Sequence, residues 1–250
     1  MNDIRIYDDK NELAHAIAGE LLALSLEAEE NDLVAHICLS GGTTPKALFE
    51  LLCHEEIAEE IAWDWLHFWW GDERCVPMDS KESNFGEAFR LLFAHIDFPE
   101  EQLHPILGEH DPEDEVIGYA EEMRRVMPLT DEGIPVFDWV LLGLGTDGHT
   151  ASLFPKGVEC ESTEIVALSR HPSAGQQRMT ITFPVIEAAS RVSFFVCGQD
   201  KAKVILGIFE GSEESKLWPA SRVEDADWWL DEAAASLIPD DEFEEECLDD

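Results

Sequence analysis

Apolar and polar residues alternate along this chain in blocks that predict strands and helices in turn. Short apolar runs, typical of buried strands, recur between segments whose apolar side chains follow the 3.6-residue period of a helix. In residues 11–29 that period is set by Leu13, Ile17, Leu21 and Leu24. The alternation predicts an α/β fold whose central sheet is mainly parallel and is covered by helices on both faces.

The individual elements follow from the same pattern. Strands are predicted at Ile4–Tyr7, residues 34–39, Leu66–Trp70, and residues 137–142, 165–168, 178–183 and 192–197. Helices are predicted at residues 11–29, 45–53, 84–94, 113–127, 201–209 and 231–237. Pro45 stands at the first position of its helix, where a missing N–H costs nothing, and Ser83 is suited to cap the next.

No internal repeat, low-complexity linker or glycine-rich hinge divides the chain. We therefore expect a single domain over residues 1–250, with a short acidic tail at residues 239–250. In open parallel sheets ligands bind beyond the carboxyl ends of the strands. The loops that follow strands are consequently the places to look for functional residues.

Charge is the most unusual feature of the composition. The chain carries 55 Asp and Glu against 16 Lys and Arg, a formal net charge of −39. Such a field repels phosphate backbones, so we expect no nucleic-acid partner. Two interpretations of the acidity stay open. It is either an ordinary solvated surface or an adaptation to a high-salt cytosol, where salt screens self-repulsion.

The cysteines and the N-terminus bear on location. The six cysteines form no C-x-x-C pair and no Cys/His cluster with zinc spacing, so we expect no metal and reduced thiols. The opening MNDIRIYDDK has no apolar signal region. No apolar run approaches the roughly 18 residues needed to span a bilayer. A cytoplasmic protein without a membrane partner is the expectation.

The first candidate motif is LSGGTTPKALFELL, at residues 39–52. A strand leads into Gly41 and Gly42, which let the backbone approach a ligand closely. Ser40, Thr43 and Thr44 add hydroxyls before a helix whose N-terminus offers free N–H groups. The spacing is not that of a Walker A loop. Either a phosphate cradle or a glycine turn with a hydroxyl cap explains the motif.

The second motif, WGDERCVPMDSKESN, spans residues 70–84 and begins at the last residue of an aromatic strand. Arg74 suits an anionic substrate group, because its planar fork binds phosphate or carboxylate oxygens in a bidentate way. In that interpretation Asp72 holds Arg74 in place. The alternative is that these charges are solvated or paired with each other.

The third motif, LLGLGTDGHTASLFP, contains Gly143, Gly145 and Gly148 in a G-x-G-x-x-G pattern. A dinucleotide loop is one interpretation, but the pattern lies in mid-chain and a proline soon cuts short any following helix. We interpret the glycines as shaping a loop that presents Asp147 and His149.

Positive charge is sparse, yet several basic residues fall near strand ends or helix starts. An acidic protein with an anionic ligand needs local cations to overcome its own field. For any one of these residues taken alone, an ordinary surface charge is the favoured explanation. The candidates are Arg74, Arg170, Arg178, Lys201 and Lys203.

Taken together, these stretches resemble the 6-phosphogluconolactonase family. The matching segments are LSGGTTPKALFELL, WGDERCVP with SN following, GLGTDGHTASLFP, RMTITFPVIEAASRVSFFVCGQDKA and LWPASRVEDADWWLDEAAASL, collinear over residues 38–237. Glucosamine-6-phosphate deaminase/isomerase relatives share the type of fold. In them the segment matching Asp72–Arg74 resembles Asp-Glu-Tyr, and the segment after DGH differs. Arg74 and residues 152–155 therefore favour the lactonase side.

The resemblance implies a Rossmann-like three-layer α/β/α sandwich that needs no metal or organic cofactor. It implies hydrolysis of 6-phospho-D-glucono-1,5-lactone to 6-phospho-D-gluconate, a step of the oxidative pentose phosphate pathway. We expect the protein to be a monomer. His149 would be the catalytic base, with Asp147 beside it. The substrate-binding residues would be Ser40, Gly41, Gly42, Thr43, Thr44, Asp72, Arg74, Gly148, Arg178 and Lys201, most of them near the phosphate.

The residues themselves favour direct attack by water, since no G-x-S-x-G nucleophile motif is present. His149 would take the proton of that water, and either glycine-loop N–H groups or Arg74 would stabilise the oxyanion. Three other functions stay open. They are an amino-sugar-phosphate deaminase or isomerase, a non-catalytic sugar-phosphate sensor, and a nicotinamide dehydrogenase.

Overall fold

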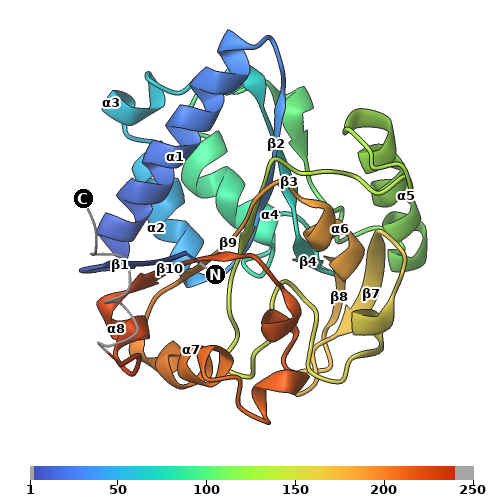
Figure 1. The fold of residues 1–250 in the computed structure, drawn as a ribbon. Helices are drawn as coiled ribbons and strands as arrows, with labels where there is room; N and C mark the ends of the chain where they lie inside the picture. The colour runs from blue at the N-terminus through green and yellow to red at the C-terminus, as the bar shows by residue number, and fades with distance from the viewer. Residues whose placement is uncertain (1–2, 240–250) are drawn as a thin grey trace.

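A seven-stranded sheet runs through the computed structural model, which describes residues 3–239 (Figure 1). Its strand order is β1-β10-β9-β6-β2-β3-β5, and every neighbouring pair is parallel. The strands are β1 (Ile4–Tyr7), β2 (Ala35–Leu39), β3 (Leu66–Trp70), β5 (Leu103–His104), β6 (Trp139–Leu142), β9 (Val192–Val196) and β10 (Asp227–Asp231). The predicted tail lies, from residue 240 on, outside the described residues.

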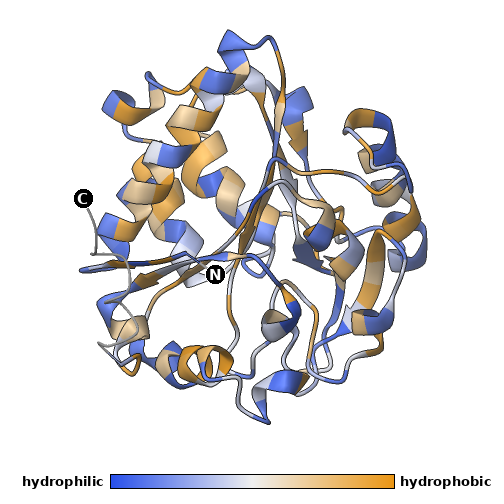
Figure 2. Ribbon diagram, in the orientation of Figure 1, coloured by the Kyte–Doolittle hydropathy of each residue, from blue (hydrophilic) through white to orange (hydrophobic). Residues whose placement is uncertain are grey.

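Helices cover both faces of this sheet, which confirms the predicted three-layer α/β/α class. The helices are α1 (Lys10–Glu30), α2 (Thr43–Leu52), α3 (Glu55–Ala58), α4 (Asn84–Ala88), α5 (Pro112–Val126), α6 (Phe183–Ala188), α7 (Ala202–Phe209) and α8 (Glu232–Ala235). Figure 1 shows α1, α2 and α4 on one side of the sheet and α6, α7 and α8 on the other. The central strands are apolar, and the helices turn polar residues outward (Figure 2).

Local signals in the sequence account for most element boundaries. Helix α1 begins where the Asp9 carboxylate accepts hydrogen bonds from the N–H groups of Asn11 and Glu12. Of its predicted apolar stripe, Leu13, Ile17 and Leu21 are buried and Leu24 is partly buried. Ser83 caps α4 as predicted, by accepting from the Gly86 N–H. The predicted helix of residues 84–94 continues after α4 as a π-helical turn, Phe89–Phe93. Helix α2 begins at Thr43, so Pro45 is its third residue, and its prediction as the first was wrong.

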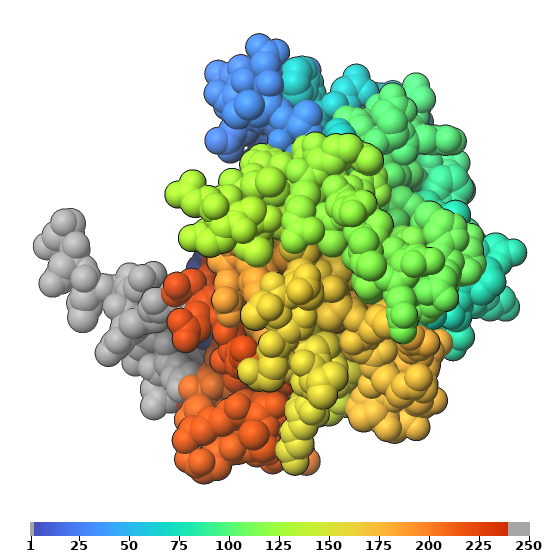
Figure 3. Space-filling model, turned by 90° about the vertical axis from the view of Figure 1, so that its right-hand side faces the viewer, coloured from blue at the N-terminus to red at the C-terminus, as the bar shows by residue number. Residues whose placement is uncertain are grey.

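A second, three-stranded antiparallel sheet of order β4-β8-β7 lies beside the main one. It comprises β4 (Asp72–Arg74), β7 (Val166–Arg170) and β8 (Gln177–Ile181). Figure 3, seen from this side, shows the segment that includes α5 above the segments that form this sheet. The periodicity predicted β7 and β8 as strands but missed β4, because three charged residues carry no apolar pattern.

The topology fixes where a ligand can bind. Strand β2 lies between β3 and β6, so the chain order reverses at β2. In an open parallel sheet a crevice forms at such a reversal, outside the carboxyl ends of the strands. Residues 40–44 follow β2 and residues 143–149 follow β6, which brings both glycine-rich motifs to this one crevice. Within the described residues, no helix is both long and apolar enough to cross a membrane.

Candidate active site

A cleft of about 320 Å³ opens at the carboxyl ends of the central strands. This volume lies at the small end of the range for ligand sites, which suits a single sugar ring with a substituent. It is lined by Ser40, Gly41, Gly42, Thr43, Thr44, Pro45, Asp72, Arg74, Asn84, Gly143, Leu144, Gly145, His149, Ala151, Arg178, Phe195, Val196 and Lys201. Of the residues that the family resemblance assigns to the site, only Asp147 and Gly148 do not line the cleft, and the candidate cations Arg170 and Lys203 do not line it either.

The turn after β2 presents a helix N-terminus to the cleft. Gly42 has a φ of 108°, a conformation that favours glycine, and α2 begins directly after it without a side-chain cap. A Cβ on Gly41 would lie 1.8 Å from Oδ1 of Asn84, so only glycine fits there. The Ser40 hydroxyl donates to the carbonyl of Leu141 at 2.7 Å and thereby joins the ends of β2 and β6. The first-turn N–H groups and the two threonines therefore remain for an anion.

The loop after β6 carries a histidine and a carboxylate in contact. Nδ1 of His149 lies 2.5 Å from Oδ1 of Asp147, and that oxygen also accepts from the His149 backbone N–H at 3.3 Å. The hydrogen bond from His149 lowers the pKa of Asp147 to about 2. An ionised Asp147 holds the proton of a neutral imidazole on Nδ1, which leaves Nε2 as the basic nitrogen.

Two glycines allow this loop its shape. Gly148, between the two functional residues, has a φ of 80°. A Cβ on Gly145 would lie 2.0 Å from Nδ1 of His149, so the imidazole occupies the space that any side chain there would take. The His149 ring packs 4.9 Å from the ring of Phe154, and 26% of its side chain remains exposed. The base is thus supported on one side and open to the cleft.

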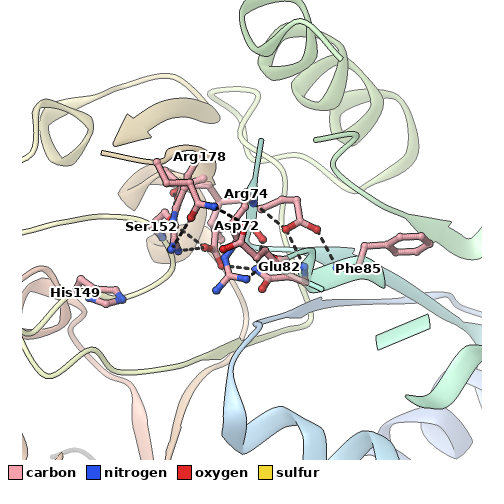
Figure 4. Close-up of polar contacts among 12 residues, drawn as sticks. Asp72, Arg74, Glu82, Phe85, His149, Ser152 and Arg178 are labelled. Atoms are coloured by element: carbon pink, nitrogen blue, oxygen red, sulfur yellow. Dashed lines mark hydrogen bonds and ion pairs between the residues drawn. The ribbon is translucent and has the colours of Figure 1, made fainter. Parts of the chain in front are cut away.

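Strands β4 and β8 contribute a cluster of polar side chains opposite the histidine (Figure 4). The buried Asp72 carboxylate accepts a hydrogen bond from the Ser152 hydroxyl at 2.6 Å and lies 3.7 Å from Nη1 of Arg178. Arg74 instead donates to the backbone carbonyl of Glu82. The prediction that Asp72 holds Arg74 was therefore wrong. The Asp72 carboxylate contacts Ser152 and Arg178 instead, because β4 turns it towards β8.

Arg74 and Arg178 face each other across the antiparallel pair of β4 and β8. Like charges directly opposite on neighbouring strands are destabilising, so the arrangement favours an anion between them. Burial lowers the pKa of Arg178, the Asp72 carboxylate beside it raises this pKa, and the proximity of Arg74 lowers it. Among residues 3–239, no carboxylate forms an ion pair with Arg74. A bound phosphate or carboxylate would neutralise both guanidinium groups.

Lys201 adds a third cation from the start of α7. Its Nζ lies 3.5 Å from a carboxylate oxygen of Asp200, which is largely exposed. Three of the chain's 16 basic residues thus line one cleft in a protein of net charge −39. Local cations of this kind reverse the repulsion that the overall charge would exert on an anionic ligand.

Sequence reasoning missed two polar residues of the site. Asn84 is buried against the Gly41 turn, and its Nδ2 donates to the backbone carbonyl of Asp72 at 2.8 Å. Ser152 joins Asp72 to the loop of His149, and its backbone N–H donates to Thr180. Neither residue shows a charge or spacing signal. Only their place in the matching segments SN and TASLFP marked them.

The site shows no arrangement typical of a metal or dinucleotide centre. Residues 3–239 contain no group of three or more His, Cys, Asp or Glu side chains placed to hold a metal ion. The G-x-G-x-x-G pattern is followed by a tight turn bridged between Thr150 and Leu153, and not by a helix. A dinucleotide loop needs that helix N-terminus for its pyrophosphate, so the pattern serves to shape the histidine loop.

Comparison with known proteins gives a consistent result. The sequence profile of the family described as glucosamine-6-phosphate isomerases/6-phosphogluconolactonase matches residues 8–230. The 6-phosphogluconolactonase of Haemophilus influenzae is 43% identical over 207 residues, which cover 81% of this chain and 87% of that protein. The crystal structure of devB protein superposes with a TM-score of 0.90 at 42% identity, covering 96% of this chain and all of the other. The 6-phosphogluconolactonase of Trypanosoma brucei gives a TM-score of 0.80 at 26% identity, covering 96% and 99%.

Proposed function

The chain belongs to the glucosamine-6-phosphate isomerase/6-phosphogluconolactonase family, and from its site we propose that it hydrolyses 6-phospho-D-glucono-1,5-lactone to 6-phospho-D-gluconate. One observation carries the proposal. A single cleft holds an imidazole oriented by a carboxylate and, across from it, the guanidinium groups of Arg74 and Arg178, which face each other on β4 and β8. The first is suited to ester hydrolysis by water, and the second to a substrate that carries a phosphate.

The reaction needs one base that can also return a proton. Nε2 of His149 takes a proton from a water molecule as the water oxygen attacks the C1 carbonyl carbon. The tetrahedral intermediate then collapses, the bond between C1 and the ring oxygen breaks, and the protonated imidazole delivers its proton to that oxygen. The product is a free acid with a hydroxyl at C5, and His149 is neutral again. A positioned base of this kind contributes about 10²–10⁴-fold.

Asp147 supports each step without exchanging a proton. Its pKa of about 2 keeps it ionised across the physiological range, so it stabilises the imidazolium that forms during the attack. The same hydrogen bond fixes the imidazole plane and tautomer. The roles resemble those of the carboxylate and the histidine in a hydrolytic triad, with water in place of a serine.

The remaining polar groups position the substrate. We assign Arg178, Lys201, Thr43, Thr44 and the N-terminus of α2 to the phosphate, since they combine positive charge with free N–H and hydroxyl donors. Arg74 faces Arg178 and, of the three cleft cations, is the one that forms no ion pair with a carboxylate of residues 3–239, so it also serves the developing negative charge on the substrate. Binding the remote phosphate then holds C1 in place for attack.

The decisive test is a coupled assay with freshly prepared 6-phosphogluconolactone, corrected for spontaneous ring opening. The purified protein should accelerate opening far above the background rate, and unphosphorylated gluconolactone should react much more slowly at equal concentration. A protein that binds 6-phosphogluconate but leaves the rate at background would be a sensor. Release of ammonia from glucosamine 6-phosphate would instead place the chain with the deaminases of its family.

We further propose that the enzyme acts as a monomer in the cytoplasm. The base and the three cations that the proposed mechanism uses belong to one copy of the chain, so the chemistry calls for no group from a second copy. The five cysteines among the described residues are all unpaired, as is usual in a reducing compartment. Light scattering on the eluted protein and fractionation of the producing cells test the two points separately.

A further inference from the structure

The segment LWPAS at residues 217–221 begins the last of the five segments that carry the family resemblance, yet none of its residues lines the cleft. It forms two short 3₁₀ turns, Ser215–Leu217 and Pro219–Arg222, after α7. Trp218, between the two turns, is half-buried. Its contacts connect this segment to the histidine loop, which raises the question of what the tryptophan does there.

One end of the Trp218 side chain lies against Gly148. A Cβ built on Gly148 would come within 2.2 Å of Cγ and 2.4 Å of Cβ of Trp218. The backbone of the same segment adds a hydrogen bond, because the N–H of Ala220 donates to the carbonyl of Gly148 at 3.0 Å. Gly148 separates Asp147 from His149, so both contacts act at the centre of the pair.

The other end of the indole lies against α7. A Cβ on Gly207 would lie 2.9 Å from Cζ3 and 3.0 Å from Cη2 of Trp218. Helix α7 starts directly after Lys201, one of the cations of the cleft. The indole therefore fills the space between the helix that follows Lys201 and the loop that carries His149. Two glycines, on separate elements, make room for it.

We propose that Trp218 is a positioning residue, which wedges the loop of Asp147 and His149 against α7 and thereby holds the imidazole in its productive orientation. The role rests on the proposed hydrolysis for its effect on rate, but not for its effect on the loop. A rigid aromatic side chain suits it, because Gly148 at the centre of the loop has no side chain of its own to pack against α7. Displacements of about 1 Å in such a pair can cost about 10²-fold in rate.

The test compares substitutions on both sides of the contact. Trp218→Ala should lower kcat about 10–100-fold with KM changed less than about twofold, because no substrate contact is removed. Trp218→Phe should retain most of the activity by keeping an aromatic ring over Gly148. Leu217→Ala is the matched control, since that neighbouring side chain is 55% exposed, and its kinetics should equal those of the unmodified protein.

A second variant, Gly207→Ala, distinguishes a displaced tryptophan from a general loss of folding. Gly207→Ala places a methyl group against the far edge of the indole while improving helix propensity in α7. It should lower kcat in the native background and have no further effect when combined with Trp218→Ala. Equal losses from Gly207→Ala in both backgrounds would overturn the proposal, as would native kcat in Trp218→Ala.

A readout without turnover separates this inference from the proposed function. Titration of the Asp147 carboxyl by carbon NMR should show a pKa near 2 in the native protein and a higher value in Trp218→Ala, as the contact with His149 loosens. An unchanged Asp147 titration in that variant would contradict the wedge even if the protein proved not to be a lactonase. Absence of lactone hydrolysis by the native protein would contradict only the proposed function.

Discussion

Two groups of histidines in this molecule show how surroundings decide what an imidazole can do. His149 stands on a glycine loop at the open edge of the sheet, beside a carboxylate. His36, His67 and His104 lie on neighbouring strands inside the fold. Nδ1 of His67 is 2.8 Å from Nε2 of His104, whose Nδ1 contacts Glu122 on α5 at 2.8 Å. Each group includes a histidine in contact with a carboxylate, but only His149 lines the cleft.

Two members of the interior group, His36 and His67, are held neutral by their surroundings. His104 stacks on Trp69 with ring centroids 3.8 Å apart, and the indole N–H of Trp69 donates to Nδ1 of His36. Burial, with smaller contributions from the neighbouring imidazoles, lowers the pKa of His36 to about 3 and that of His67 to about 4. An imidazole in such a place serves packing and hydrogen bonding, whereas an exposed one beside an ionised carboxylate can accept and return a proton.

The largest expected effect separates the two groups directly. His149→Ala should lower kcat about 10²–10⁴-fold, because the base is lost, while binding of 6-phosphogluconate persists. His67→Phe should do the reverse, with nearly native kcat and a free energy of unfolding reduced by about 1–3 kcal/mol as His104 loses a hydrogen-bond partner. Steady-state kinetics and urea denaturation of both variants provide the comparison. Near-native turnover by His149→Ala would remove the assignment of the base.

A smaller effect concerns the cations opposite His149. Arg178→Ala should raise KM for the phosphorylated lactone about 10–100-fold, the loss of one charged hydrogen-bonding group, and affect kcat less. Arg170→Ala on the neighbouring strand β7 is the matched control, because Arg170 is exposed and does not line the cleft. Equal losses for phosphorylated and unphosphorylated lactones would argue against a phosphate role for Arg178.

Lowering the pH should reduce the contribution that His36 and His67 make to the stability of the fold. Because the folded-state pKa values of His36 and His67 lie below 6.5, the unfolded chain binds more protons between pH 6.5 and about pH 3–4. Their contribution to stability is complete above pH 6.5 and is lost as the pH falls through that window, by about 1–2 kcal/mol for each histidine at pH 5. Chemical denaturation at pH 7 and pH 5 should show a smaller difference for His67→Phe than for the native protein. Identical differences would contradict the burial argument.

Added salt should produce the smallest effects. It should stabilise the fold by screening the acidic surface, and it should weaken substrate binding in the cleft. If the acidity is an adaptation to high salt, molar KCl should stabilise the fold by about 1 kcal/mol, a rise in Tm of about 2–4 °C. The same salt should raise KM, because it screens the attraction of the three cleft cations for phosphate. A melting temperature that stays flat or falls between low and molar KCl would leave an ordinary acidic surface as the explanation.

Local chemistry made much of this molecule predictable. The apolar periodicity indicated five of the seven strands of the main sheet and most of the helices, and hence the α/β class, because each element buries its own stripe or face. It did not indicate β5 or β10. The cap at Ser83, the glycine turn after β2 and the contact of Asp147 with His149 all involve residues no more than a few positions apart. Interactions of that range are set by the backbone and the adjacent side chains, so the sequence by itself specifies them.

Tertiary structure alone decided which distant residues meet. The placement of Arg74 opposite Arg178, the orientation of Asp72 towards Ser152 and the wedge of Trp218 over Gly148 join segments far apart in the chain. None of these contacts leaves a periodic or spacing signal, since each depends on how β4 leaves the main sheet and how α7 packs. The same holds for His36 and His67, whose low pKa values arise from burial that no single segment encodes.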